Sequence, residues 1–115
     1  MPAFAFVAPI VPGKEQLDAE TFEQFTVGGE HEAYVAARRA AGVTREAVWH
    51  QRTPDGETLA IVLLEAEDVE AAFSHIVTSD ALFDRRFRAM LQEVHGFDLA
   101  SSPPPDVRLI CDTRF

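Results

Sequence analysis

The stretch that decides the fold is Arg45-Glu-Ala-Val-Trp-His-Gln-Arg-Thr53, followed by Pro54-Asp-Gly56 and then Glu57-Thr-Leu-Ala-Ile-Val-Leu-Leu-Glu65. Proline presets φ for a turn, aspartate can close it with its side chain, and glycine accepts a positive φ. Apolar and β-branched residues on both sides of such a turn are typical of a β-hairpin. The stretch therefore predicts two antiparallel strands, at 45–53 and 57–65.

Two further strands are expected near the ends of the sequence. Residues 3–11 are apolar at both alternating sets of positions, which indicates a strand covered on both faces, and Pro12-Gly13 ends it. After the proline-rich connector 101–105, residues 106–115 place apolar or small side chains at every second position, which is typical of a half-buried strand. These positions are Val107, Leu109, Cys111 and Thr113.

Helical spacing of apolar residues fills the two intervals between the strands. Gly28-Gly29 interrupts the first helical region, 14–41, and leaves one kinked helix and two separate helices both open. The second region runs from an Asp68 cap to Gly96, with a break near 78–80.

This order, β-α-β-β-α-β, predicts a single α+β domain over residues 1–115. With right-handed crossovers it gives the ferredoxin-like arrangement, a four-stranded antiparallel sheet with both helical regions on one face. The strands at 3–11 and 57–65 are apolar on both sides, so the other face of the sheet needs a cover. A second copy of the chain is the simplest cover, and we expect a homodimer.

The residue composition and net charge limit the kinds of partner that the chain is expected to bind. Nineteen acidic against ten basic residues give a formal charge of −9, so nucleic acid is not an expected partner. We expect no membrane association, because the sequence has neither a long apolar run nor a lysine-rich patch. The single cysteine, Cys111, fits a reducing cytoplasm, and the apolar start lacks the charged region of a signal peptide.

The predicted order with an apolar open face resembles the dimeric α+β barrel superfamily. That superfamily includes antibiotic-biosynthesis-type monooxygenases, EthD-like proteins and chlorite-dismutase-like haem proteins. Four local stretches are similar to a small bacterial group within it: 41–49, 51–56, 79–88 and 94–98. The resemblance implies a dimeric barrel and, by analogy of fold alone, a monooxygenase-like activity.

The dipeptide Trp49-His50 is the first candidate for a functional site. Neighbours on a strand point to opposite faces, so one residue faces the helices and the other faces the dimer interior; which is which stays open. His50 could act as an acid or base, or it could be an interface residue beside a core Trp49. His75, which flanks an apolar helical stripe, is the second candidate catalytic residue.

Aromatic residues suit a flat apolar ligand in a cavity between helices and sheet. The expected pocket residues are Trp49, Tyr34, Phe22, Phe73 and Phe87.

Neither a metal nor another cofactor is predicted. His31-Glu32 would need a second histidine at position 35 for a zinc-protease motif, and that position is Val35. Haem binding through His75 or His95 stays open, because haem proteins share the fold that the chain resembles.

Two functions of different class follow. In the first, the chain binds a small apolar or aromatic molecule, and His50 or His75 takes a proton from an acidic phenolic substrate. In the second, it is a non-catalytic homodimeric interaction module. A cavity of roughly 300 Å³ or more that reaches either histidine would favour the first function.

Overall fold

The expected hairpin forms the centre of the molecule in the computed structural model, which describes residues 2–115. Strand β2 (Val43–Arg52) pairs antiparallel with β3 (Thr58–Ala66). In the turn, Gly56 has a φ of +86° and its N–H donates to the Thr53 carbonyl at 2.9 Å. The Pro-Asp-Gly prediction is confirmed.

A third strand completes the sheet. β1 (Ala3–Pro9) pairs antiparallel with the other side of β3, which gives the order β1-β3-β2. One row across the three strands holds Phe6, Val62 and Val48, and the next holds Val7, Ile61 and Trp49. Alternate rows therefore point to opposite faces of the sheet.

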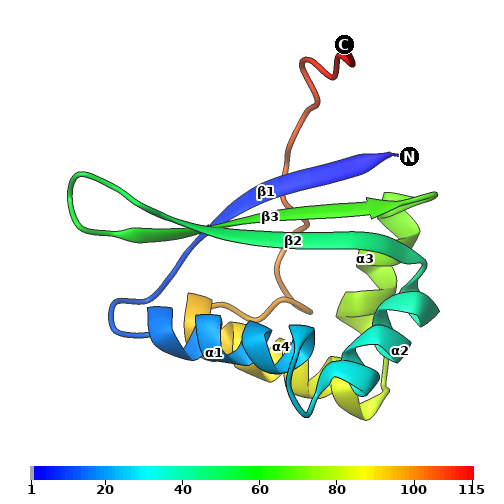
Figure 1. The fold of residues 1–115 in the computed structure, drawn as a ribbon, viewed down its shortest axis with the longest axis horizontal. Helices are drawn as coiled ribbons and strands as arrows, with labels where there is room; N and C mark the ends of the chain where they lie inside the picture. The colour runs from blue at the N-terminus through cyan, green and yellow to red at the C-terminus, as the bar shows by residue number, and fades with distance from the viewer. Residues whose placement is uncertain (1) are drawn as a thin grey trace.

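In the part of the chain that the structure describes, four helices lie on one face of the sheet (Figure 1). The region at 14–41 forms two of them, α1 (Glu15–Thr26) and α2 (His31–Ala41). At the break, a Cβ on Gly28 would lie 2.4 Å from the Gln24 side-chain oxygen and 2.8 Å from its Cα. Only glycine allows the chain to fold back so closely on the end of α1.

The second helical region also divides in two, as expected. α3 (Val69–Thr78) begins at Asp68, whose carboxylate accepts from the Ala71 N–H at 3.0 Å. α4 (Leu82–His95) ends at Gly96 in the left-handed conformation, with a φ of +77°. The predicted cap and the predicted stop are both confirmed.

The predicted fourth strand, 106–115, does not form in the part of the chain that the structure describes. The order is β-α-α-β-β-α-α, followed by a segment without regular structure, so the full ferredoxin-like βαββαβ arrangement is not what the chain adopts here. In Figure 1 this segment passes the sheet and ends on the side away from the helices. Its alternating apolar residues lack a strand beside them, and Cys111, expected to be buried, is exposed. Alternation predicts the capacity to pair, but pairing also needs an edge within reach.

Candidate functional site

A narrow apolar cavity lies between the sheet and the helices. Its volume is about 50 Å³, which is room for a few water molecules. Three of the aromatic residues expected in a pocket line it, namely Phe22, Phe73 and Phe87.

Polar side chains interrupt this apolar lining. Asp18 from α1, Arg38 from α2, Glu46 from β2 and His95 from the end of α4 all border the cavity. Asp18 is 1% exposed and Arg38 is 5% exposed. Burying charged groups costs free energy unless they are paired, so the partners of these groups decide what the site can do.

Arg38 is the cation of this cluster. Its Nε donates to Glu46 Oε1 at 2.7 Å, and its guanidinium lies over the Phe87 ring, 4.4 Å from the centroid. Its two terminal nitrogens have no hydrogen-bond partner among residues 2–115. The pairing with Glu46 and the aromatic contact hold the group in place, while its outer edge keeps unused donors.

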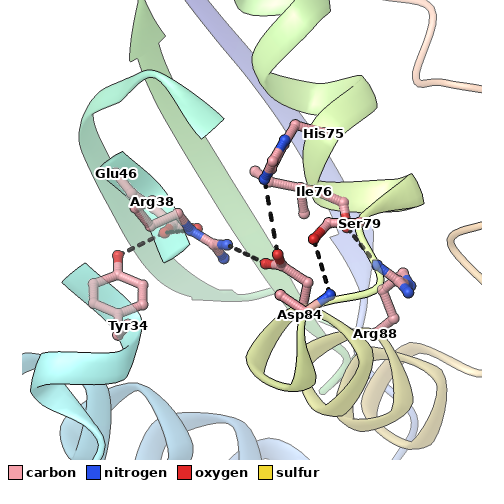
Figure 2. Close-up of polar contacts among 9 residues, drawn as sticks. Tyr34, Arg38, Glu46, His75, Ile76, Ser79, Asp84 and Arg88 are labelled. Atoms are coloured by element: carbon pink, nitrogen blue, oxygen red, sulfur yellow. Dashed lines mark hydrogen bonds and ion pairs between the residues drawn. The ribbon is translucent and has the colours of Figure 1, made fainter. Parts of the chain in front are cut away.

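Asp84 stands on the other side of Arg38, as Figure 2 shows. Its Oδ1 lies 3.9 Å from Arg38 Nη1, and its Oδ2 lies 3.9 Å from Nε2 of His75. Both distances are too long for direct hydrogen bonds. His75, which was predicted to be catalytic, thus lies at the half-exposed end of a buried charged chain and is not among the residues that line the cavity.

Tyr34 closes the cluster at the opposite end. Its hydroxyl donates to Glu46 Oε1 at 2.5 Å, the same oxygen that Arg38 uses (Figure 2). Burial and the negative charge of Glu46 raise the pKa of Tyr34 well above its usual range. Its ring stacks on Phe25, with the centroids 5.1 Å apart. Tyr34 therefore supports the cluster and does not line the cavity as predicted.

His50, the other predicted catalytic residue, faces the helices. Its Nε2 lies 2.7 Å from Asp18 Oδ2, and because a carboxylate only accepts, that nitrogen carries a proton. Asp18 Oδ1 has no hydrogen-bond partner within the described chain. His50 does not line the cavity, whereas its partner Asp18 does.

Trp49 points away from this site. It lies on the outer face of the sheet, one residue from His50, and is 50% exposed. The question of which residue faces which side is thereby answered. The structure brings Phe22, Phe73 and Phe87 together, places His50 and His75 at two separate edges of the charged cluster, and leaves Trp49 outside.

Four charged residues were missed as site residues by sequence reasoning. Three of them are charged helix residues, Asp18 on α1, Arg38 on α2 and Asp84 on α4, and charged residues are ordinarily found at the surface. The fourth is Glu46, on the inward-facing side of β2.

A signal for three of them exists in the sequence. Each takes a position in the apolar stripe of its helix, where a nonpolar residue is expected. The stripes are Asp18, Phe22, Phe25 on α1; Tyr34, Arg38, Ala41 on α2; and Asp84, Phe87, Leu91 on α4. A charged residue inside the apolar stripe of three of the helices, α1, α2 and α4, is the pattern that could have found the cluster.

A larger cleft adjoins the cavity. It has a volume of about 520 Å³ and lies between α3 and the segment 99–107. Phe73 and Leu99 line both spaces, so these two side chains separate the cleft from the charged cluster. Its size falls in the range of small-molecule sites.

His95 is the histidine that borders the cavity. Its Nδ1 lies 2.8 Å from the Pro9 carbonyl, which only accepts, so Nδ1 carries the proton. This contact ties the end of α4 to the end of β1.

Comparisons with protein-family models, with curated proteins and with solved structures find no match to this chain. Within residues 2–115, no three His, Cys, Asp or Glu side chains converge as metal ligands would. None of the helices described here has the length and apolar character needed to cross a membrane.

Proposed function

We propose that this protein binds a small, mainly apolar or aromatic molecule that carries one polar oxygen. The observation that supports this proposal is the pair of terminal nitrogens on the Arg38 guanidinium. Its terminal nitrogens lack partners within residues 2–115, although the guanidinium is buried on the wall of an apolar cavity. Buried donors are normally satisfied, so an oxygen atom in this cavity is the natural acceptor.

The charge around Arg38 selects the kind of oxygen. Glu46 and Asp84 flank the single guanidinium, so the cluster already carries more negative than positive charge. A carboxylate or phosphate would add to this excess, whereas a carbonyl or phenol oxygen would not. The proposed ligand is therefore neutral when it enters.

The space for the ligand is the cleft of about 520 Å³ together with the inner cavity. The inner cavity alone, at about 50 Å³, is smaller than the roughly 150 Å³ that holds a benzene ring. Rotation of Phe73 or Leu99 would join the two spaces. The apolar part of the ligand would then occupy the cleft and its oxygen would reach Arg38.

Proton transfer is the chemistry that this arrangement supports. Asp18 lines the same cavity as Arg38 and its Oδ1 has no hydrogen-bond partner within residues 2–115, so an acidic phenol held by Arg38 would lie near a carboxylate base. His50, hydrogen-bonded to the other oxygen and partly exposed, connects that base to solvent. In this proposal His50 assists Asp18, and a monooxygenase-like reaction remains an analogy of fold.

The test uses 4-ethylphenol and the nitrogen-labelled full chain, followed by NMR. Saturable shifts of the amides around Phe73, Leu99 and Arg38 are expected. Ser74→Trp, which fills the cleft, should weaken binding at least about tenfold, because the ligand loses its apolar contacts. Ala71→Trp on the same helix is the matched control, since Ala71 does not line the cleft.

Shifts confined to the outer face around Trp49, or equal weakening by both tryptophan variants, would contradict the proposed site. Native mass spectrometry of freshly purified protein is the companion measurement, because a retained adduct would identify the natural ligand class.

A second function is favoured by the outer face of the sheet, which is mainly apolar and, within residues 2–115, carries no helix (Figure 1). Its apolar residues are Ala3, Ala5, Val7, Ala47, Trp49, Leu59, Ile61 and Leu63, and Arg45 and Glu65 lie opposite each other at one end. Apolar patches of this kind mark association sites. We propose that a second copy covers this face, as in the dimeric barrels that the sequence resembles, so that the chain could also serve as a homodimeric interaction module without catalysis.

A further inference from the structure

The segment 106–115 carries exposed apolar side chains and lies outside the sheet. Leu109 is 71% exposed and Ile110 is 76% exposed. Within residues 2–115, its backbone forms no hydrogen bonds with a strand. Since β-strands need a partner for their N–H and C=O groups, a segment with strand-like alternation and no partner has an unused capacity to pair.

The segment also stands away from its own sheet. Gaps of about 540 and 810 Å³ separate it from the outer face, the first next to Val7 and Ile61 and the second next to Leu63. In Figure 1 it continues past the sheet on the side opposite to the helices. That is the side on which the proposed second copy would lie.

The two edges of the sheet differ in how they are protected. The β2 edge has a register shift between Val43 and Arg45 and carries Arg45 and Arg52. Bulges and charges of this kind prevent further strands from adding. The β1 edge is Ala-Phe-Ala-Phe-Val-Ala-Pro, without a charged residue, and its pairing with β3 runs without a shift. It is the edge that can accept a strand.

We propose that residues 106–115 of one copy add as a strand to β1 of a second copy, and that the exchange is reciprocal. This inference rests on the proposed homodimer. The added strand would supply the fourth strand that the sequence predicts. Val107, Leu109 and Cys111 would face the apolar interface. The alternate positions, Arg108, Ile110, Asp112 and Arg114, would lie on the other side, and three of these four are charged.

Cys111 provides the test, because it is the only cysteine and is exposed. A chain with Cys111→Ser and Ala5→Cys is mixed with the natural chain, so that each copy carries one thiol. Mild oxidation should give a covalent heterodimer, identified by intact mass. The matched control replaces Ala5→Cys by Ala36→Cys, on the exposed side of α2, and should give at least about tenfold less heterodimer.

The same pair of thiols in one chain tests the competing arrangement. Ala5→Cys with Cys111 retained, oxidised at low concentration, should again give mainly dimers. A monomer with an internal disulfide would show that the segment pairs with its own β1 and would overturn the proposal.

A final variant separates this inference from the dimer itself. Leu109→Pro removes a backbone donor from the segment and should raise the dimer dissociation constant at least about tenfold. If the natural chain is dimeric but Leu109→Pro and the disulfide tests have no effect, the strand exchange is wrong and the dimer stands. If the natural chain is monomeric at every concentration, both fail.

Discussion

The two faces of the sheet come from the same three strands and have opposite chemistry. On the helix side, Glu46 belongs to a buried cluster of three charged residues beside an apolar cavity. The other two members are Arg38 and Asp84. On the outer side, the row that contains Trp49 is apolar and exposed. The comparison teaches that apolar character does not mark the site in this molecule. The proposed ligand site lies where polar groups are buried, and the proposed association surface lies where apolar groups are exposed.

The helix-side cluster is expected to have the largest energetic effect when it is broken. Arg38→Met leaves Glu46 and Asp84 buried without their shared cation, which should lower the free energy of unfolding by about 3–5 kcal/mol. Arg39→Met is the matched control on the same helix. Arg39 is exposed, so its loss should change the free energy by less than about 0.5 kcal/mol. Urea denaturation of both variants measures the difference.

Adding Glu46→Gln to Arg38→Met sharpens this result. With one buried negative charge gone, part of the lost stability should return, and the two effects should not add. Equal stability of Arg38→Met and the natural chain would mean that the cluster is not a buried charged site at all.

A substitution on the outer face should weaken association of the chain and leave its folding stability unchanged. Trp49→Glu puts a charge on the proposed interface but removes no buried partner, so the isolated chain should keep its fold. The dimer dissociation constant should rise about a hundredfold, equivalent to about 2.8 kcal/mol. Analytical ultracentrifugation over a range of concentrations measures it, with Ala36→Glu on the helix side as the control.

A natural chain that stays monomeric, or a Trp49→Glu variant that associates as well as the natural one, would remove the proposed role of the outer face. Trp49 is the only tryptophan, so its fluorescence reports on that face alone. Emission that shifts to shorter wavelength with rising concentration would report its burial on association.

Local patterns predicted the elements well. The turn at 54–56, the Asp68 cap and the Gly96 stop depend on a few neighbouring residues, and each is found where the sequence placed it. The strand at 106–115 was wrong for this chain, because a strand needs an edge, and the distance to an edge is not encoded in alternation.

The site was harder to predict because its residues are ordinary in isolation. Asp18 and Arg38 look like solvent-exposed helix residues until their positions in the apolar stripes are counted. Phe22, Phe73 and Phe87 line the inner cavity, and their place there follows from helical spacing, since apolar residues at that spacing point to the core. The same alternation on β2 could not decide between Trp49 and His50, because both orientations satisfy it.

The smallest expected effect concerns the ionisation of Tyr34. It tests whether the cluster on the helix side is closed to water, in contrast to the exposed outer face. Tyr34 is the only tyrosine, so the phenolate absorbance follows this group alone. Burial, and then the charge of Glu46, raise its pKa in the folded chain above the ordinary value of about 10. A group whose folded pKa is raised contributes its full stability below the unfolded pKa. That contribution is therefore present below about pH 10 and is lost as the pH rises above it.

Glu46→Gln should lower the folded pKa of Tyr34 toward the ordinary value, because it removes the charge that opposes the phenolate, while Glu65→Gln on the outer face should leave it unchanged. An ordinary pKa of Tyr34 in a chain that circular dichroism shows to be folded would mean that water reaches the cluster. The helix side would then not be closed to solvent, and the contrast between the two faces would fail.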